Sequence, residues 1–221
     1  MTTVIAQPRK KAARFVNGAE WWHAIGDVPL RRVIFDPPPG TATEADLLWL
    51  LELEDRACEL IDGTLVEKPV GNWESVLAAR IIVVLGTFVM ERKLGACSGE
   101  HGPLRTSRSR IRIPDVSFFS VDQFPSRKIP RVAVMPFTPA LAIEVLSKSN
   151  TKREMRKKRK EYFAAETREV WMVDPKQLTI SIYERGDEEP VHVFRREETL
   201  SGRKLLPGFR MKLAELFSEE I

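Results

Sequence analysis

The chain has 221 residues, of which 43% are apolar, enough to bury a hydrophobic core and to exclude a wholly disordered protein. The formal net charge is +4, but the segment 148–160 alone holds eight lysines and arginines against one acid. The two cysteines show no metal-ligand spacing, which excludes a disulfide scaffold and a zinc site and favours a reducing cytoplasm.

Residues 1–40 are predicted to form a basic N-terminal extension. Arg9, Lys10, Lys11 and Arg14 supply its charge, and the triple proline in DPPPG, residues 36–40, marks a boundary because proline cannot continue a helix or a central strand. The N-terminus lacks the apolar segment of a signal peptide. We expect a separate domain to begin at residue 41.

The longest apolar run, residues 81–90, is shorter than a membrane-spanning helix requires. We therefore expect a cytoplasmic protein with no membrane partner.

Secondary-structure signals over residues 41–221 are typical of an α/β domain. Thr43 and Asp46 have the spacing of a helix capping box, and Asp62-Gly63 is a dipeptide typical of a tight hairpin. The further predicted elements are a long helix capped by Asn72, strands within 107–120 and 140–147, a basic helix over about 150–166, and a hairpin across Asp174-Pro175. This order predicts a mixed β-sheet with helices packed on its faces.

Three carboxylates, Glu59, Asp115 and Glu144, lie in or at the end of otherwise apolar strands. Any one of them could cap a loop or pair with an arginine. Several acids gathered at one sheet edge would repel each other and stay ionised only around a cation. Oxygen ligands suit Mg²⁺ or Mn²⁺, ions that act on phosphoryl groups. We expect such a site if the three converge.

Strand alternation in RIRIPDV places Arg108, Arg110 and Arg112 on one face, expected to be solvated, and Asp115 on the core face.

The basic helix should turn Lys158 and Arg159 toward its packed side, with Met155 and Tyr162. Their long stems could cover the core while the charges reach water. Alternatively, a lysine is aimed at the carboxylates just upstream. The other basic side chains could contact a nucleic-acid backbone, although a solvated charged face is a competing explanation. The residues expected to contact nucleic acid are Lys148, Lys152, Arg153, Arg156, Lys157, Arg110 and Arg112.

Several segments together resemble the Uma-type restriction endonucleases, a branch of the PD-(D/E)XK nuclease superfamily. They are CELIDGTLVEKP at 58–69, IPDV at 113–116, LAIEVLSKSN at 141–150, KxxxY from Lys158 to Tyr162, and EVWMVDP at 169–175. The resemblance covers about residues 41–217. It implies a restriction-endonuclease-like fold, a mixed sheet flanked by helices, with divalent-metal hydrolysis of phosphodiesters.

The resemblance also implies roles for single residues. Asp115 and Glu144 match the implied metal ligands, and Glu59 matches a hairpin acid that supports the metal or its water. The lysine expected two residues after Glu144 is Leu146, so Lys158 is predicted to take the catalytic lysine's role, with Lys148 as second choice.

Glu74 stands where many relatives have a histidine. It could add a metal contact, or place a favourable charge at a helix N-terminus.

The sequence therefore predicts a Mg²⁺- or Mn²⁺-dependent endonuclease that acts on DNA. The missing lysine at position 146 leaves open a nucleic-acid-binding module that does not cleave, and the fold leaves open a hydrolase acting on RNA or a smaller phosphodiester. A homodimer is expected, because two-fold symmetry suits cutting both strands of a duplex.

Overall fold

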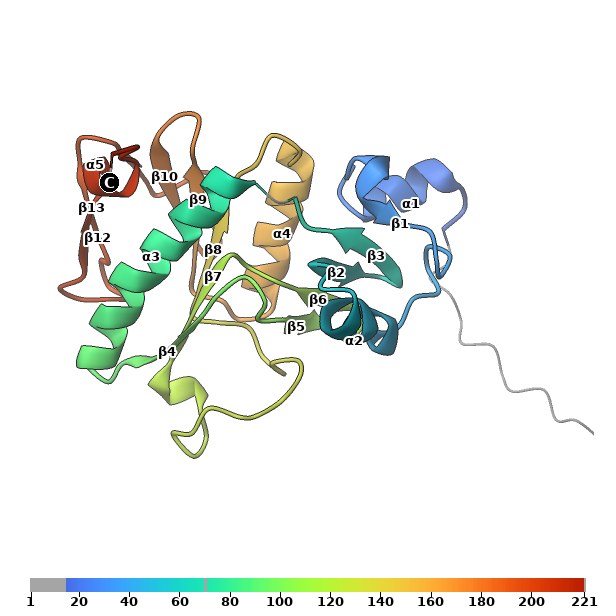
Figure 1. The fold of residues 1–221 in the computed structure, drawn as a ribbon, viewed down its shortest axis with the longest axis horizontal. Coiled ribbons are helices and arrows are strands. Elements are labelled where there is room, and N and C mark those ends of the chain that lie inside the picture. The colour runs from blue at the N-terminus through green and yellow to red at the C-terminus, as the bar shows by residue number, and fades with distance from the viewer. Residues whose placement is uncertain (1–14, 70, 221) are drawn as a thin grey trace, which may run out of the picture.

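A computed structural model describes residues 15–69 and 71–220 of the chain. Arg9, Lys10, Lys11 and Arg14, the charges predicted for the extension, lie outside the described residues. The described strands form sheets of five, six and two strands, and helices lie between and beside them (Figure 1).

The five-stranded sheet is antiparallel and contains the predicted hairpin. Its order is β1-β3-β2-β6-β5, with β1 (Val33–Ile34), β2 (Cys58–Ile61), β3 (Thr64–Glu67), β5 (Leu104–Ser107) and β6 (Arg110–Arg112). Asp62 and Gly63 form the turn between β2 and β3, both with positive φ, which confirms the hairpin. Helix α2 (Glu44–Leu53) packs on this sheet and begins with the predicted capping box of Thr43 and Asp46.

The six-stranded sheet is mixed, as predicted, because β8 and β9 pair in parallel while its other neighbouring strands are antiparallel. Its order is β11-β10-β9-β8-β7-β4, with β4 (Gly95–Ser98), β7 (Val116–Ser120), β8 (Leu141–Val145), β9 (Glu169–Asp174), β10 (Thr179–Glu184) and β11 (His192–Arg195). The turn from β9 to β10 confirms the second predicted hairpin.

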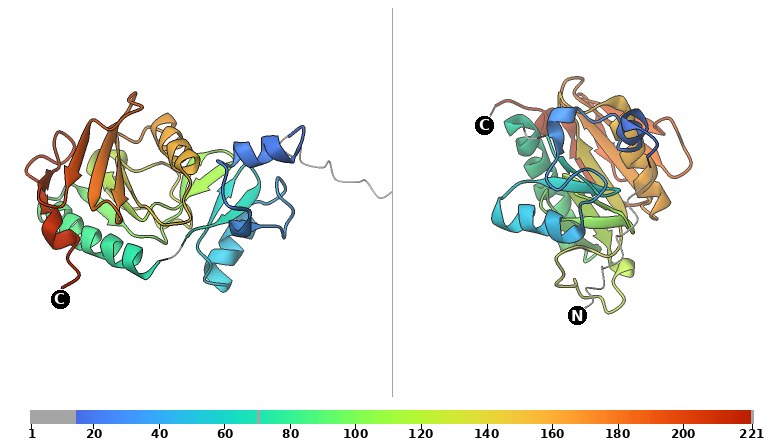
Figure 2. Two further views of the ribbon diagram at one scale, coloured as in Figure 1. Left: turned by 90° about the horizontal axis from the view of Figure 1, so that it is seen from above. Right: turned by 90° about the vertical axis from the view of Figure 1, so that its right-hand side faces the viewer.

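Two helices cover opposite faces of this sheet (Figure 1). Helix α3 (Asn72–Glu91) packs against Ile143 and Val145 of β8, whereas α4 (Lys152–Ala164) packs on the face of Ala142. Alternation along β8 therefore directs Glu144 toward α4. Figure 2 shows α4 between the two large sheets. Its Lys158 side chain contacts both, because it pairs with Glu59 on β2 and with Glu144 on β8.

Helix α3 is, within residues 15–69 and 71–220, the one helix long and apolar enough to cross a membrane. Its length exceeds the run 81–90 because the less apolar residues 72–80 precede that run in the same helix. Leu77, Ile81 and Leu85 are buried in the hydrophobic core, and in all 28% of the apolar window of this helix is buried. The helix is capped by Gly71, and Asn72 is its first residue rather than the predicted cap.

The described part of the N-terminal extension packs against the domain. Helix α1 (Gly18–Ala24) and the short 3-10 helix η1 (Leu30–Arg32) precede β1, which pairs with β3. Trp21 donates a hydrogen bond to Thr64 on β3. Residues 15–40 thus extend the five-stranded sheet.

The C-terminal segment packs against α3. Strands β12 (Thr199–Ser201) and β13 (Arg210–Lys212) form the two-stranded sheet, and helix α5 (Leu213–Leu216) follows. Arg80 of α3 donates to the main-chain oxygens of Leu216 and Ser218.

A further 3-10 helix, η2 (Val121–Gln123), follows β7.

Candidate active site

The structure brings Glu59, Asp115 and Glu144 to the junction of the two large sheets. Glu59 lies on β2, Asp115 in the turn that joins β6 to β7, and Glu144 on β8. The alternation predicted over 107–120 is interrupted at Ile113-Pro114-Asp115, between β6 and β7, because proline has no amide hydrogen for a sheet ladder. The interruption lets the Asp115 carboxylate accept a hydrogen bond, 2.7 Å long, from the Val145 amide at the end of β8.

Lys158 joins two of these carboxylates. Its Nζ lies 2.9 Å from Oε1 of Glu59 and 2.9 Å from Oε2 of Glu144, and the lysine is 3% exposed. The Tyr162 hydroxyl, one helical turn later, donates to Oε1 of Glu144 over 2.5 Å. The predicted inward direction of Lys158 and its approach to the upstream carboxylates are therefore confirmed. The charge does not reach water, so snorkelling does not describe it.

Charge pairing and burial set the ionisation of the cluster. Burial raises the pKa of Glu144, with Asp115 and Glu59 adding to the rise and Lys158 opposing it. Burial also acts to raise the pKa of Glu59, but the charges of Lys158 and Arg112 outweigh it and hold that pKa well below its usual range. Burial would lower the pKa of Lys158, yet the two glutamates raise it above its ordinary value. Lys158 is therefore a fixed positive charge at neutral pH.

Lys68, which the sequence did not single out, completes the cluster. It follows β3, is 9% exposed, and its Nζ lies 2.7 Å from Oδ1 of Asp115. Asp115 therefore holds a lysine with one oxygen and the Val145 amide with the other. The position of Lys68 directly after the strand signal of TLVE, residues 64–67, could have drawn attention to it. Its partner Asp115, however, lies 47 residues away in the sequence.

Arg112 lies in the interior, and the predictions that it is solvated and contacts nucleic acid are wrong. It is 1% exposed and pairs with Glu59 at 2.8 Å and with Glu161 of α4 at 2.7 Å. A buried arginine without these partners would be costly, so both carboxylates hold it in place. Arg110, two residues earlier, remains partly exposed and pairs with Asp62 and Glu161.

The donor set around Asp115 and Glu144 suits a hard divalent cation. Both side chains carry carboxylate oxygens, and the charge of Asp115 raises the pKa of Glu144, a repulsion that a cation would relieve. Each of these oxygens now accepts from a protein group, so a cation would have to displace at least one of these contacts. The described residues contain no group of three or more His, Cys, Asp or Glu side chains arranged to hold a metal. Glu59 is engaged by Lys158, Arg112 and the Ile113 amide.

Glu74 lies in the first turn of α3. Its carboxylate folds back over Gly71, where even a Cβ atom would overlap it. Of the two roles considered for Glu74, this placement favours that of a negative charge that stabilises the helix N-terminus.

Apart from Arg112, the basic side chains predicted to contact nucleic acid divide between two cavities that share Arg156. The first, of about 620 Å³, lies between α1, the β5–β6 turn and α4, and Arg110, Arg153, Arg156 and Lys157 line it. The second, of about 950 Å³, lies beside the end of β8, and Lys148, Lys152 and Arg156 line it. Leu146, at the position expected for lysine, also lines the second cavity.

Burial, with the nearby Arg110 charge, lowers the pKa of Lys157 in the first cavity. An anion there would relieve the crowding of positive charge.

Comparisons with known proteins agree with this architecture. The structure is similar to one described as the crystal structure of "a putative nuclease belonging to DUF820 from Anabaena variabilis", with a TM-score of 0.64 and 20% identity. The match covers 74% of this chain and 90% of that chain, and confirms the restriction-endonuclease-like fold. No curated protein matches the sequence significantly. The sequence pattern of the Uma2 family, described as "Putative restriction endonuclease", matches residues 43–214, more than half of the chain. The chain therefore belongs to the Uma2 family.

Proposed function

We propose that the protein is a divalent-metal-dependent endonuclease that hydrolyses phosphodiester bonds in DNA. Family membership indicates a nuclease. The observation that carries the proposal is the convergence of Asp115 and Glu144 on one junction, with Lys68 and Lys158 paired to them. Two acids and two lysines at such short range match the charges that phosphoryl chemistry requires.

Asp115 and Glu144 would hold Mg²⁺ or Mn²⁺, which lowers the pKa of a bound water and neutralises the charge of the phosphate. Asp115 is the more accessible of the two, because its side chain is 15% exposed and that of Glu144 is 4% exposed. The Val145 amide holds the Asp115 carboxylate in one orientation. Glu59 acts through Lys158 and Arg112 rather than as a third ligand.

Lys158 takes the role of a fixed positive charge. Its raised pKa keeps it protonated at neutral pH, so it orients Glu144 and stabilises negative charge instead of accepting a proton from water. Lys68 is the second lysine of the site and lies beside the more accessible carboxylate. We assign to Lys68 the contact with the scissile phosphate. Binding of that phosphate would draw the Lys68 ammonium group away from Asp115.

A second candidate function is binding of nucleic acid without cleavage. Leu146 at the usual lysine position favours it, because Lys158 is buried and cannot leave the two glutamates without stranding their charges. Hydrolysis of RNA or a smaller phosphodiester is the further alternative. A homodimer in the cytoplasm remains the expected state for cutting duplex DNA.

A substrate comparison separates these functions. Supercoiled plasmid, single-stranded RNA and bis(p-nitrophenyl) phosphate are each incubated with the full chain and Mg²⁺, Mn²⁺ or EDTA. We expect nicked and linear plasmid with either ion and none with EDTA. Cleavage of RNA alone would support the RNA hydrolase. Salt-dependent DNA binding without nicking under either ion would support the non-cleaving module and contradict the proposal.

Arg156 offers a test of the DNA contacts, because its exposed side chain lines both cavities. Removing one phosphate contact should reduce the slope of log K against log salt concentration by about 1, with little change in sequence preference. We expect this change in Arg156→Ala when duplex binding is measured by fluorescence anisotropy over a salt series. Arg195→Ala is the matched control, because Arg195 is exposed on β11 outside both cavities. Equal slopes in the two variants would remove Arg156 from the interface.

A further inference from the structure

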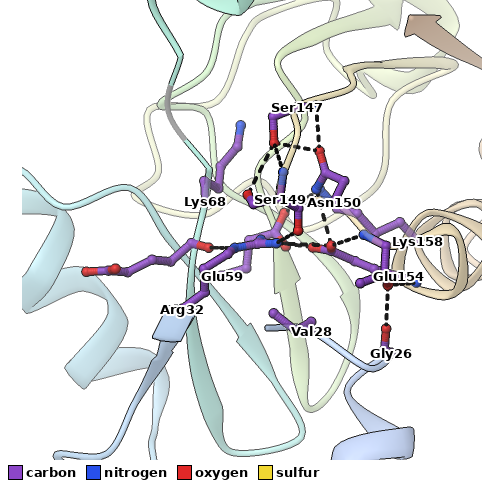
Figure 3. Close-up of polar contacts among 12 residues, drawn as sticks. Gly26, Val28, Arg32, Glu59, Lys68, Ser147, Ser149, Asn150, Glu154 and Lys158 are labelled. Carbon is purple, nitrogen blue, oxygen red and sulfur yellow. Dashed lines mark hydrogen bonds and ion pairs between the residues drawn. The ribbon is translucent and has the colours of Figure 1, made fainter. Parts of the chain in front are cut away.

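Arg32 is a buried arginine from the N-terminal extension that reaches the elements of the candidate active site (Figure 3). It ends η1, lies outside the segment 43–214 that matches the family, and is 6% exposed. Its Nη1 and Nη2 donate to both oxygens of Glu154 at 3.0 and 2.9 Å, and its Nε donates to the Glu67 carbonyl at 2.8 Å. A weaker bond of 3.4 Å reaches the Ser149 carbonyl.

Each of these contacts lies within five residues, along the chain, of a residue of the proposed reaction centre. Glu67 precedes Lys68, which pairs with Asp115. Ser149 belongs to the turn after β8, the strand that carries Glu144. Glu154 is one helical turn before Lys158 on α4. One guanidinium group thus connects β3, the end of β8 and the start of α4.

The partner of Arg32 is itself held by a local network. Glu154 accepts hydrogen bonds from the Asn150 side chain and the Thr151 amide, and Asn150 accepts from the Ser147 amide. The Thr151 hydroxyl donates to the carbonyl of Gly26, which adds a second contact with the extension (Figure 3). The planar, two-pronged geometry of arginine suits a carboxylate in this fixed orientation, and a lysine cannot reproduce it.

We propose that Arg32 is a positioning residue, which sets the placement of Lys68, Glu144 and Lys158 relative to one another. The extension is then part of the frame of the active site, although it lies outside the matched family segment. This inference rests on the proposed function. Arg32 itself is enclosed by protein groups and does not touch substrate. The competing explanation is that the contact only attaches the extension and contributes to stability.

Two variants separate positioning from stability. Arg32→Lys keeps the charge and loses the paired hydrogen bonds. Arg32→Met/Glu154→Gln removes both charges together, and glutamine retains an acceptor for the start of α4. Replacing both partners of a buried ion pair can recover stability that the loss of one partner removes. We therefore expect the double variant to melt at a higher temperature than Arg32→Met alone, without recovering activity.

The first readout is plasmid cleavage under single-turnover conditions with Mg²⁺. We expect Arg32→Lys and the double variant to cleave about 10- to 100-fold more slowly, because displacement of reacting groups by about 1 Å can cost 100-fold. The dissociation constant for DNA should stay within about twofold, because the lining of the basic cavities is unchanged. The neighbouring, exposed Arg31→Met serves as control and should match the wild type. Recovery of the wild-type rate in the double variant, in step with its melting temperature, would overturn the proposal.

The second readout is hydrogen exchange of the Val145 amide, which donates to Asp115. We expect faster exchange in Arg32→Lys and in the double variant, and wild-type exchange in Arg31→Met. Exchange equal to wild type in all variants would contradict positioning. This measurement does not depend on cleavage, so a wild-type protein that cuts none of the substrates would refute the nuclease function while the exchange data still decide the role of Arg32.

Discussion

Asp115→Asn is expected to slow metal-dependent cleavage by about 1,000-fold or more, an effect similar to removing one preorganised group that stabilises the transition state. The substitution removes the negative charge that would hold the cation and keeps an oxygen that can accept from the Val145 amide. The side chain therefore keeps its shape but loses its ion pair with Lys68. Single-turnover cleavage of plasmid and titration with Mn²⁺ measure the loss of rate and of metal affinity separately.

Asp122→Asn is the matched control for that variant. Asp122 lies in η2, where its exposed carboxylate pairs with Arg168. The Asp122→Asn variant should cleave at the wild-type rate, because exposed ion pairs of this kind contribute little to stability. Melting curves of both variants test whether they fold. If folded Asp115→Asn cuts as fast as the control, Asp115 is not a ligand and the proposed site is wrong.

Lys158→Met is expected to lower the free energy of unfolding by about 3–5 kcal/mol, because it leaves the buried carboxylates of Glu59 and Glu144 without their shared cation. Chemical denaturation followed by circular dichroism measures the change. Glu144→Gln/Lys158→Met should lose less than the single variant, because glutamine carries no charge and Glu59 keeps its ion pair with Arg112. Lys160→Met is the control, because Lys160 is exposed and pairs with the exposed Glu188.

The loss in Lys158→Met should depend on pH in a defined direction. Without the lysine, burial and the charges of Asp115 and Glu59 raise the folded-state pKa of Glu144 further above the unfolded value, which is near 4.5. The folded variant then binds more protons than the unfolded chain, so its stability falls as pH rises from about 4.5 toward neutrality. The gap to the wild type should widen over that range. A gap that stays constant with pH would mean that the carboxylates find other compensation.

Local patterns were sufficient for much of the fold. The spacing of Thr43 and Asp46, the dipeptide Asp62-Gly63 and the apolar periodicity around Lys158 each depend on residues a few positions apart. Caps, tight turns and helix faces are determined at that range. The same periodicity explains why the inward direction of Lys158 could be predicted. Alternation through RIRIPDV, by contrast, does not show that the strand ends before Pro114 and that a new strand begins at Val116.

The sequence alone determined the family and the α/β class. It also identified Asp115, Glu144 and Lys158, which the fold brings together. Only the tertiary structure decided the partners of the buried charges. Lys68 meets Asp115 across 47 residues, and Arg32 meets Glu154 across 122. Alternation indicates which face a side chain takes but not whether another element covers that face. Arg112 was therefore predicted to be solvated, although α4 supplies the Glu161 that buries it.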